Sequence, residues 1–232
     1  LARIDMAIDF VEQDINREQA LSRLRYEAST MRELVEDTLT FAWLNTESPQ
    51  LNSDDFDLVE LFNVICEDAR FEYPDRTLHV DTPECANIEK SSQLALGQAL
   101  ENIIRNALRH TPEQSKVSLT LTSDNNNYVI TVTDEGTGVP ESMLDAIFEP
   151  FFRVDKARAA KNYVHAAKRS GFGLGLALAK RQIAAVGGDI SAINRAALIK
   201  GNALHRDASA TKQTGLVVTI TLPKSFNAAF AN

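Results

Sequence analysis

Positive charge, paired cysteines and long apolar runs are all scarce in this sequence. Its 232 residues carry 24 Lys and Arg against 32 Asp and Glu, a formal net charge of −8. Nucleic acid is therefore not expected as a partner, because binding it needs a concentrated basic surface. Cys66 and Cys85 form no CxxC pair, which argues against a zinc site or disulfide framework and favours two buried, inert thiols. No secretory signal is visible, and no apolar run approaches the roughly 18–20 residues of a membrane span, so no direct membrane contact is expected.

Glycine is also sparse, and most of it lies in one region. Seven of the ten glycines fall between Gly136 and Gly188, and five of those seven form two tight clusters. Glycine is favoured where the backbone turns sharply or approaches a ligand closely. This region is the first place to expect a binding site.

The first 45 residues have almost no helix breakers. Apolar and small residues recur in alternate steps of four and three, a seam typical of helix-on-helix packing: Leu24, Ala28, Met31, Val35, Thr38 and Ala42. Residues 14–18 indicate a turn between two antiparallel helices, although one long helix is also compatible. A hairpin this small cannot bury both apolar faces alone. We expect it to form a homodimer; the alternative is two ordinary core helices.

A polar, proline-containing segment separates this hairpin from an α/β pattern. We predict a hairpin over residues 1–46, a linker over 47–52, a second domain over 53–226 and a tail over 227–232. Apolar periodicity in the second domain predicts helices over 58–69, 92–108 and 174–186 and strands over 77–80, 117–122, 128–133, 190–193 and 216–222. Helices and strands do not alternate strictly, so we expect an α+β protein whose second domain is a two-layer α/β sandwich with a mixed sheet.

Two asparagines mark the strongest predicted helix. Asn102 and Asn106 are four residues apart and share one helix face, with Arg109 and His110 one turn further on. A neutral amide oxygen can ligate Mg²⁺ without cancelling its charge, and the basic pair can reach the same anion. The alternative is a solvated helix edge.

A carboxylate and two glycines directly follow a predicted strand, in the stretch from Asp134 to Pro140. An acid at this position can accept a hydrogen bond from the exocyclic amine of a purine, while glycines let the backbone lie flat against the ring. The alternative is a hairpin or a loose turn. Both interpretations place the residues in a connection at a strand end.

Two further segments complete the pattern. Residues 148–153 (FEPFFR) place three aromatics around a proline, which more often fill a core, with Arg153 as the member expected to contact phosphate. Residues 171–176 (GFGLGL) lead into a helix, whose N-terminus offers free N–H groups and a favourable dipole for phosphate. A lone GxGxG is weak, and its meaning depends on the other segments.

In order and spacing, the four segments resemble the N, G1, F and G2 boxes of two-component histidine kinases, which have a gyrase/Hsp90-like ATP-binding fold. The boxes correspond to Asn102–Ala107, Asp134–Gly138, Phe148–Arg153 and Gly171–Leu176, and the resemblance covers roughly residues 52–224. It implies ATP and Mg²⁺ as ligands, with Asn106 ligating Mg²⁺, Asp134 holding adenine and residues 153–170 forming a lid. The implied nucleotide-binding set is Asn102, Asn106, Arg109, His110, Asp134, Gly136, Gly138, Val139, Phe151, Arg153, Gly171, Gly173, Leu174, Gly175 and Leu176.

The resemblance also implies how the bound nucleotide reacts. In ATP-hydrolysing relatives a glutamate lies four residues before the magnesium asparagine, where this chain has Asn102, an amide that cannot act as a base. We therefore expect slow hydrolysis and transfer of the γ-phosphoryl group to a histidine, then to the aspartate of a response regulator.

The phospho-accepting histidine of the family is not matched by any of the four in this sequence: His79, His110, His165 and His205. Leu1–Ile4 resembles the residues directly after the family's accepting segment, so we expect a chain that binds ATP–Mg²⁺, cannot phosphorylate itself and dimerises less firmly. The resemblance implies a bacterial inner-membrane sensor as parent, with this part on the cytoplasmic side. Alternatives are a serine kinase of the same superfamily and a nucleotide-sensing scaffold without transferase activity. The polar excursion over 194–214 is interpreted as a surface loop or, alternatively, a partner contact.

Overall fold

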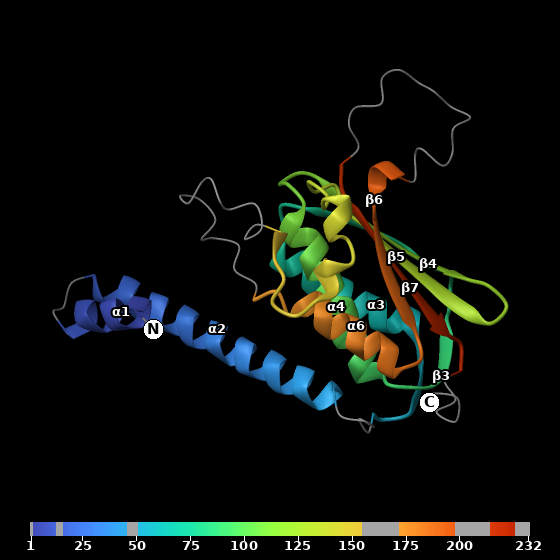
Figure 1. Cartoon of the computed structure of the whole chain (residues 1–232), viewed down its shortest axis with the longest axis horizontal. Helices are drawn as coiled ribbons and strands as arrows, with labels where there is room; N and C mark the ends of the chain where they lie inside the picture. Colours follow the sequence, from blue (N-terminus) through green and yellow to red (C-terminus); the bar gives the residue numbers. More distant parts are fainter. Residues whose placement is uncertain (1, 13–15, 46–50, 155–171, 198–213, 226–232) are drawn as a thin grey trace, which may run out of the picture. The chain divides into compact units, whose positions relative to one another are not determined.

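The computed structural model describes residues 2–12, 16–45, 51–154, 172–197 and 214–225 (Figure 1). Backbone contacts divide the chain into two compact units, Leu1–Trp43 and Leu44–Asn232. The boundaries predicted for the linker and the tail involve residues 46–50 and 226–232, which lie outside the described residues, and they stay predictions. Among the described residues, no helix is long and apolar enough to cross a membrane.

The first unit is formed by two helices, α1 (Ala2–Glu12) and α2 (Arg17–Leu44), that fold back on each other (Figure 1). The break between them supports the predicted hairpin over the alternative of one long helix. Small residues lie in its interior: Ala7 is 1% and Ala20 5% exposed. Large apolar side chains of the predicted seam remain exposed on α2, including Met31 and Val35, so the hairpin does not bury its own apolar seam.

The second unit contains a five-stranded mixed sheet in the order β2-β4-β5-β7-β6. β2 pairs in parallel with β4, and every other neighbouring pair is antiparallel. The mixed sheet is therefore confirmed. The strands are β2 (Thr77–Asp81), β4 (Lys116–Ser123), β5 (Asn127–Thr133), β6 (Asp189–Asn194) and β7 (Leu216–Pro223).

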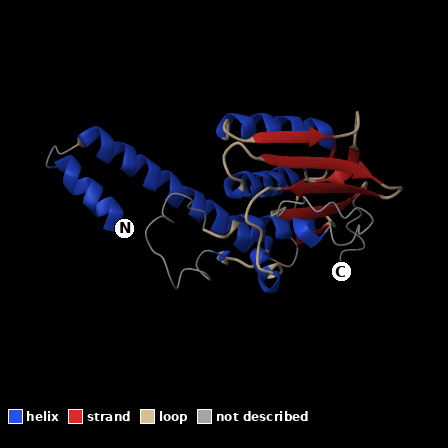
Figure 2. Ribbon diagram, turned by 90° about the horizontal axis from the view of Figure 1, so that it is seen from above, coloured by secondary structure: helices blue, strands red, loops and turns tan. Residues whose placement is uncertain are grey.

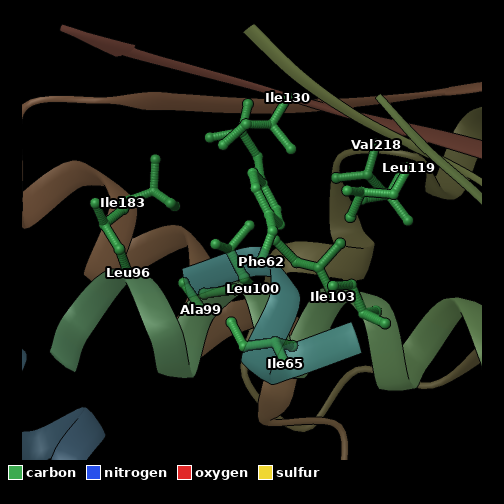
Figure 3. Close-up of a cluster of buried hydrophobic side chains, with 14 of the residues drawn as sticks. Phe62, Ile65, Leu96, Ala99, Leu100, Ile103, Leu119, Ile130, Ile183 and Val218 are labelled. Atoms are coloured by element: carbon green, nitrogen blue, oxygen red, sulfur yellow. The ribbon is translucent and has the colours of Figure 1, made fainter. Parts of the chain in front are cut away.

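Three helices pack on one face of this sheet: α3 (Leu58–Glu72), α4 (Gln93–His110) and α6 (Gly175–Ala185) (Figure 1). Figure 2 shows the strands grouped beside the helices. Alternate residues of β5 are buried, as expected for a sheet covered on one face. Figure 3 shows Phe62 and Leu100 between the helices and the strand residue Ile130; all three are fully buried. The predicted two-layer sandwich is confirmed.

A smaller sheet was not predicted from the sequence. β1 (Asp54–Asp57) pairs antiparallel with β3 (Asn87–Ser91), although both strands are polar. Asp57 holds this region together, since its Oδ1 accepts hydrogen bonds from the N–H groups of Val59 and Ala86, each at 2.8 Å, and caps α3. Two short 3₁₀ turns, η1 (Glu141–Met143) and η2 (Ala146–Phe148), connect β5 to the segment before α6.

The expectation of two buried cysteines is half wrong. Cys66 is buried on α3, whereas Cys85 is exposed in the connection between β2 and β3. Burial raises the pKa of the Cys66 thiol. The sequence around Cys85 is polar, which agrees with its exposure.

Candidate functional site

The two asparagines of α4 lie on the side of the helix that faces α6. Burial of Leu100, Ile103 and Ile104 against the sheet fixes the rotation of α4, and the asparagines then fall at the half-buried edge. A Cβ atom placed on Gly175 would lie 3.1 Å from Oδ1 of Asn102, so the start of α6 packs directly against that amide.

Asn106 is half-buried one turn further along α4, and its side chain receives no hydrogen bond from the described residues. Its amide oxygen is therefore available to a ligand. Arg105 lies elsewhere: its Nε is 3.0 Å from Oε2 of Glu72 at the end of α3. Arg109 is half-buried and His110 exposed in the last turn of α4.

Asp134 directly follows β5 and is 5% exposed. Its Oδ1 accepts two backbone hydrogen bonds, from the N–H of Gly136 at 2.7 Å and of Leu216 at 3.1 Å. Burial raises the pKa of this carboxyl group, and the two backbone N–H donors, His110 and Arg195 oppose the rise. Because both bonds go to Oδ1, Oδ2 takes no hydrogen bond from the described residues, and a buried acceptor remains for a ligand donor.

The loop after Asp134 passes close to the end of α4. A Cβ atom on Gly136 would lie 2.8 Å from the carbonyl oxygen of His110, which is closer than side chains tolerate. The first and second sequence motifs therefore meet backbone to backbone. This contact explains why glycine is required at position 136.

The aromatic segment meets the glycine-rich segment in the same way. The N–H of Phe151 donates a 2.8 Å hydrogen bond to the carbonyl oxygen of Gly173, and a Cβ atom on Gly173 would lie 2.6 Å from the carbonyl oxygen of Phe152. Phe148 is buried with Nζ of Lys180 5.5 Å above its ring, whereas Phe151 is 57% exposed. The motif thus divides into a core residue and a surface residue.

The start of α6 presents backbone N–H groups that no side chain caps. The N-cap residue, Leu174, makes no side-chain hydrogen bond to the helix, and α6 continues for 11 residues. Such a terminus favours an anion through its free N–H groups and its dipole. Leu174 is 1% exposed, so its side chain belongs to the core and only its backbone faces a ligand. Leu176 is half-buried.

The structure places most of the predicted site residues and leaves some undescribed. Gly171 and the basic lid residues Lys156, Arg158, Lys161, Lys168 and Arg169 lie outside the described residues, as do His165, His205 and Tyr163. Arg153, the first residue of the segment predicted to form the lid, is described and half-buried.

Sequence reasoning missed a group of residues at the open end of the β6–β7 hairpin. Asn194 exchanges two hydrogen bonds with Val139, and Nη1 of Arg195 lies 3.2 Å from Oε1 of Glu135. The polar excursion was predicted to begin at about residue 194, yet Asn194 is the last residue of β6. The strand alternation carried a signal, because Asn194 follows Ile190 and Ala192 on the buried face.

Comparison with known proteins identifies the family of this arrangement. Residues 91–225 match the family described as histidine kinase-, DNA gyrase B- and HSP90-like ATPase. The chain is 36% identical over 200 residues to the sensor protein PfeS of Pseudomonas aeruginosa, covering 84% of this chain and 41% of PfeS. It is 34% identical over 178 residues to the sensor histidine kinase WalK of Bacillus subtilis, covering 71% of this chain and 26% of WalK.

A solved structure supports the fold over most of the chain. Full-length ShkA in complex with AMPPNP superposes with a TM-score of 0.67 at 23% identity, covering 90% of this chain and 39% of ShkA. The chain spans less than half the length of the curated relatives PfeS and WalK. With all four motifs in contact and the family match covering more than half of the sequence, the chain belongs to the histidine kinase-, DNA gyrase B- and HSP90-like ATPases, an ATP-binding family, among the sensor histidine kinases of two-component systems.

Proposed function

We propose that the second unit binds ATP with Mg²⁺ between α4, the loop after β5 and the start of α6, and that the bound ATP donates its γ-phosphoryl group to a protein histidine. One observation carries the proposal. Four motifs far apart in sequence meet through close approaches at Gly136, Gly173 and Gly175, beside a buried carboxylate with an unused oxygen. ShkA, a protein of similar fold, was solved with AMPPNP, a nucleotide of the expected kind.

In this proposal each motif has one task. Oδ2 of Asp134 accepts the exocyclic amine of adenine, while Gly136, Gly138 and Val139 line the base. The backbone N–H groups of residues 173–176, together with Arg109, His110 and Arg153, hold the phosphates. Phe151, which is exposed beside Gly173, covers the nucleotide from the lid side, and Gly171 completes the phosphate-binding loop.

The metal-binding part of the proposal depends on a small set of oxygen ligands. The described residues contain no group of three His, Cys, Asp or Glu side chains able to hold a metal by themselves. Mg²⁺ is commonly bound by few protein ligands plus substrate phosphates. The unengaged amide oxygen of Asn106 fits that role, and the ion would neutralise charge on the triphosphate.

The chemistry proposed is transfer of phosphate to a side chain, with little hydrolysis. The imidazole nitrogen of the accepting histidine attacks the γ-phosphorus, the bond to the β–γ bridging oxygen breaks, and ADP leaves. Asn102 lies against Gly175 and is an amide, so it cannot activate water as a base. Positioning and charge stabilisation are sufficient for phosphoryl transfer.

We propose further that the helical hairpin forms a homodimer and that the phosphoryl group passes to the aspartate of a response regulator receiver domain. The exposed apolar seam of α2, including Met31 and Val35, supports the dimer. The relatives PfeS and WalK are sensor proteins, which supports a two-component pathway. The chain covers 41% of PfeS and 26% of WalK, and the proposed parent is a longer, membrane-bound bacterial sensor with this part on the cytoplasmic side.

Isothermal calorimetry with ATP and Mg²⁺ tests the binding step. The wild-type chain should bind one ATP per chain, and Asp134→Asn should bind at least tenfold more weakly, because Asp134→Asn substitutes a carboxamide for the carboxylate that accepts from adenine. Asp81→Asn, an exposed change at the end of β2, is the matched control and should bind as the wild type does. Binding that is equal in wild type and Asp134→Asn would refute the assignment.

Phosphorylation of the full-length protein tests the transfer step. Label from γ-³²P-ATP that is acid-labile and base-stable indicates phosphohistidine. Phosphoserine on a partner protein would instead support a serine kinase, and nucleotide binding without any transfer would support a sensing scaffold.

A further inference from the structure

Asn194 lies at a position where the strand pattern calls for an apolar residue. It ends β6, and the inward row of that strand is Ile190, Ala192 and Asn194. Ile190 is 7% exposed, while the outward Ile193 is 39% exposed. A carboxamide on the inward row has to be hydrogen-bonded, since an unpaired polar group at this depth is unfavourable.

The carboxamide is paired on both sides with one residue of the loop after β5. The N–H of Val139 donates to Oδ1 of Asn194 at 2.9 Å, and Nδ2 of Asn194 donates to the carbonyl oxygen of Val139 at 2.6 Å. This double exchange reproduces the pairing of two peptide groups in neighbouring antiparallel strands. A carboxamide carries the donor and the acceptor that the exchange requires, whereas a carboxylate carries only acceptors.

The same side chain contacts the glycine before Val139. Gly138 has φ of +66°, and a Cβ atom on it would lie 2.7 Å from Oδ1 of Asn194. The left-handed backbone of Gly138 and the side chain of Asn194 therefore depend on each other. A different loop conformation would break both hydrogen bonds to Val139.

The hairpin end formed by β6 and β7 holds the rest of the loop as well. The N–H of Leu216 donates to Oδ1 of Asp134, and Nη1 of Arg195 contacts Oε1 of Glu135 at 3.2 Å. The loop is thus held at residues 134, 135 and 139 from one side. Of these contacts, the Asn194–Val139 exchange is the one at the end of the loop remote from β5.

We propose that Asn194 is a positioning residue for the adenine-binding loop, holding Gly138 and Val139 where they receive the base. This inference rests on the proposed function, because it concerns the same nucleotide site. Both hydrogen bonds of the carboxamide go to the Val139 backbone, so Asn194 acts through the loop. Through this pairing, a carboxamide at the end of β6 contributes to the affinity for the nucleotide.

The test is the ATP affinity of Asn194→Asp as a function of pH. At neutral pH the new carboxylate faces the carbonyl oxygen of Val139, and the dissociation constant for ATP–Mg²⁺ should rise about tenfold relative to wild type. When the pH falls toward the ordinary pKa of an aspartate, about 3.9, the side chain regains an O–H donor and becomes an isostere of asparagine. The ratio of variant to wild-type dissociation constants should therefore stay near its neutral value down to pH of about 6 and shrink between pH of about 6 and about 4.5.

Measuring the ratio at each pH removes the titration of ATP and of Asp134, which are common to both proteins. Asn63→Asp, the same change on the exposed face of α3, is the matched control and should keep a ratio near one throughout. Thermal unfolding of each variant confirms that it is folded at the assay temperature. Should Asn194→Asp unfold, the uncharged Asn194→Ser is measured at neutral pH, where loss of one of the two hydrogen bonds should weaken ATP binding severalfold.

The outcomes separate this inference from the proposed function. A ratio near one at neutral pH, or a loss of affinity that does not recover on acidification, contradicts the positioning role of Asn194. Failure of the folded wild-type chain to take up ATP at any pH refutes the proposed function itself.

Discussion

Gly215 is the position where a single methyl group should disturb both stability and nucleotide binding. Its φ is +139°, a conformation that side chains rarely adopt, and a Cβ atom there would overlap the carbonyl oxygen of Asp134 and lie 2.9 Å from its carbonyl carbon. Backbone strain of this kind costs about 1–3 kcal/mol, and overpacking about 1–3 kcal/mol more. Gly215→Ala should therefore lose about 4 kcal/mol of unfolding free energy, or about 8–16 °C in melting temperature for a domain of this size.

The effect should extend to ATP, since relief of the overlap displaces the backbone of Asp134. Differential scanning calorimetry and ATP titration of the folded variant measure the two effects. Gly97→Ala is the matched control: the nearest atom to its new Cβ is Cδ1 of Leu61 at 3.5 Å, an ordinary contact, and alanine favours the helix. The reasoning is wrong if Gly215→Ala melts within about 2 °C of wild type, a change of about 1 kcal/mol or less.

Three further predictions concern the interior of the second unit. Leu100→Ala, at a fully buried position in the helix–sheet interface, should lose about 2–5 kcal/mol of unfolding free energy in urea denaturation with an unchanged m-value. Gln182→Met should leave the free energy of unfolding unchanged or raise it by up to about 2 kcal/mol, because Oε1 of the buried Gln182 has no hydrogen-bond partner. The exposed Gln98, which loses the hydrogen bond from Nε2 of Gln182, can bond to water instead. A loss above about 1 kcal/mol would contradict this prediction. Burial raises the pKa of Asp134 in the folded state, so its contribution to stability is present below the unfolded pKa of about 3.9 and is lost as pH rises through the folded pKa. The melting temperature of Asp134→Asn should therefore rise increasingly above that of wild type from pH of about 4 to about 7. A difference in melting temperature that does not depend on pH would refute the sign.

Long periodic elements were predictable from the sequence, because burial of one face forces the pattern. Leu96, Leu100 and Ile103 predicted α4 to within two residues of its observed ends, and apolar alternation predicted β4 and β5. The strand β1 was missed since its sequence, DDFD, is that of a turn. It forms a strand because Asp57 caps α3 and pairs with the segment around Ala86, a tertiary effect that local propensity does not contain.

The parts of the candidate site that consist of glycines and of a carboxylate at a strand end were predictable from the sequence. The motifs predicted Gly136, Gly173 and Gly175 as ligand-facing. In the structure Gly136 and Gly173 lie where one backbone passes another, and Gly175 lies against the side chain of Asn102. Their sequence pattern cannot separate the two uses, because both demand the absence of a side chain. Asn194 was missed for a different reason: its partner, Val139, lies 55 residues away, and only the folded sheet brings them together.

The backbone-to-backbone assembly of the site has a practical consequence for finding inhibitors. Since the candidate site is built from elements between Asn102 and Leu216, a compound bound there should stabilise most of the domain against heating. At about one hundred times its dissociation constant such a compound adds about 2.7 kcal/mol, or roughly 5–11 °C in melting temperature. Dye-based thermal screening of compound libraries should therefore report occupancy directly, without any phosphotransfer assay.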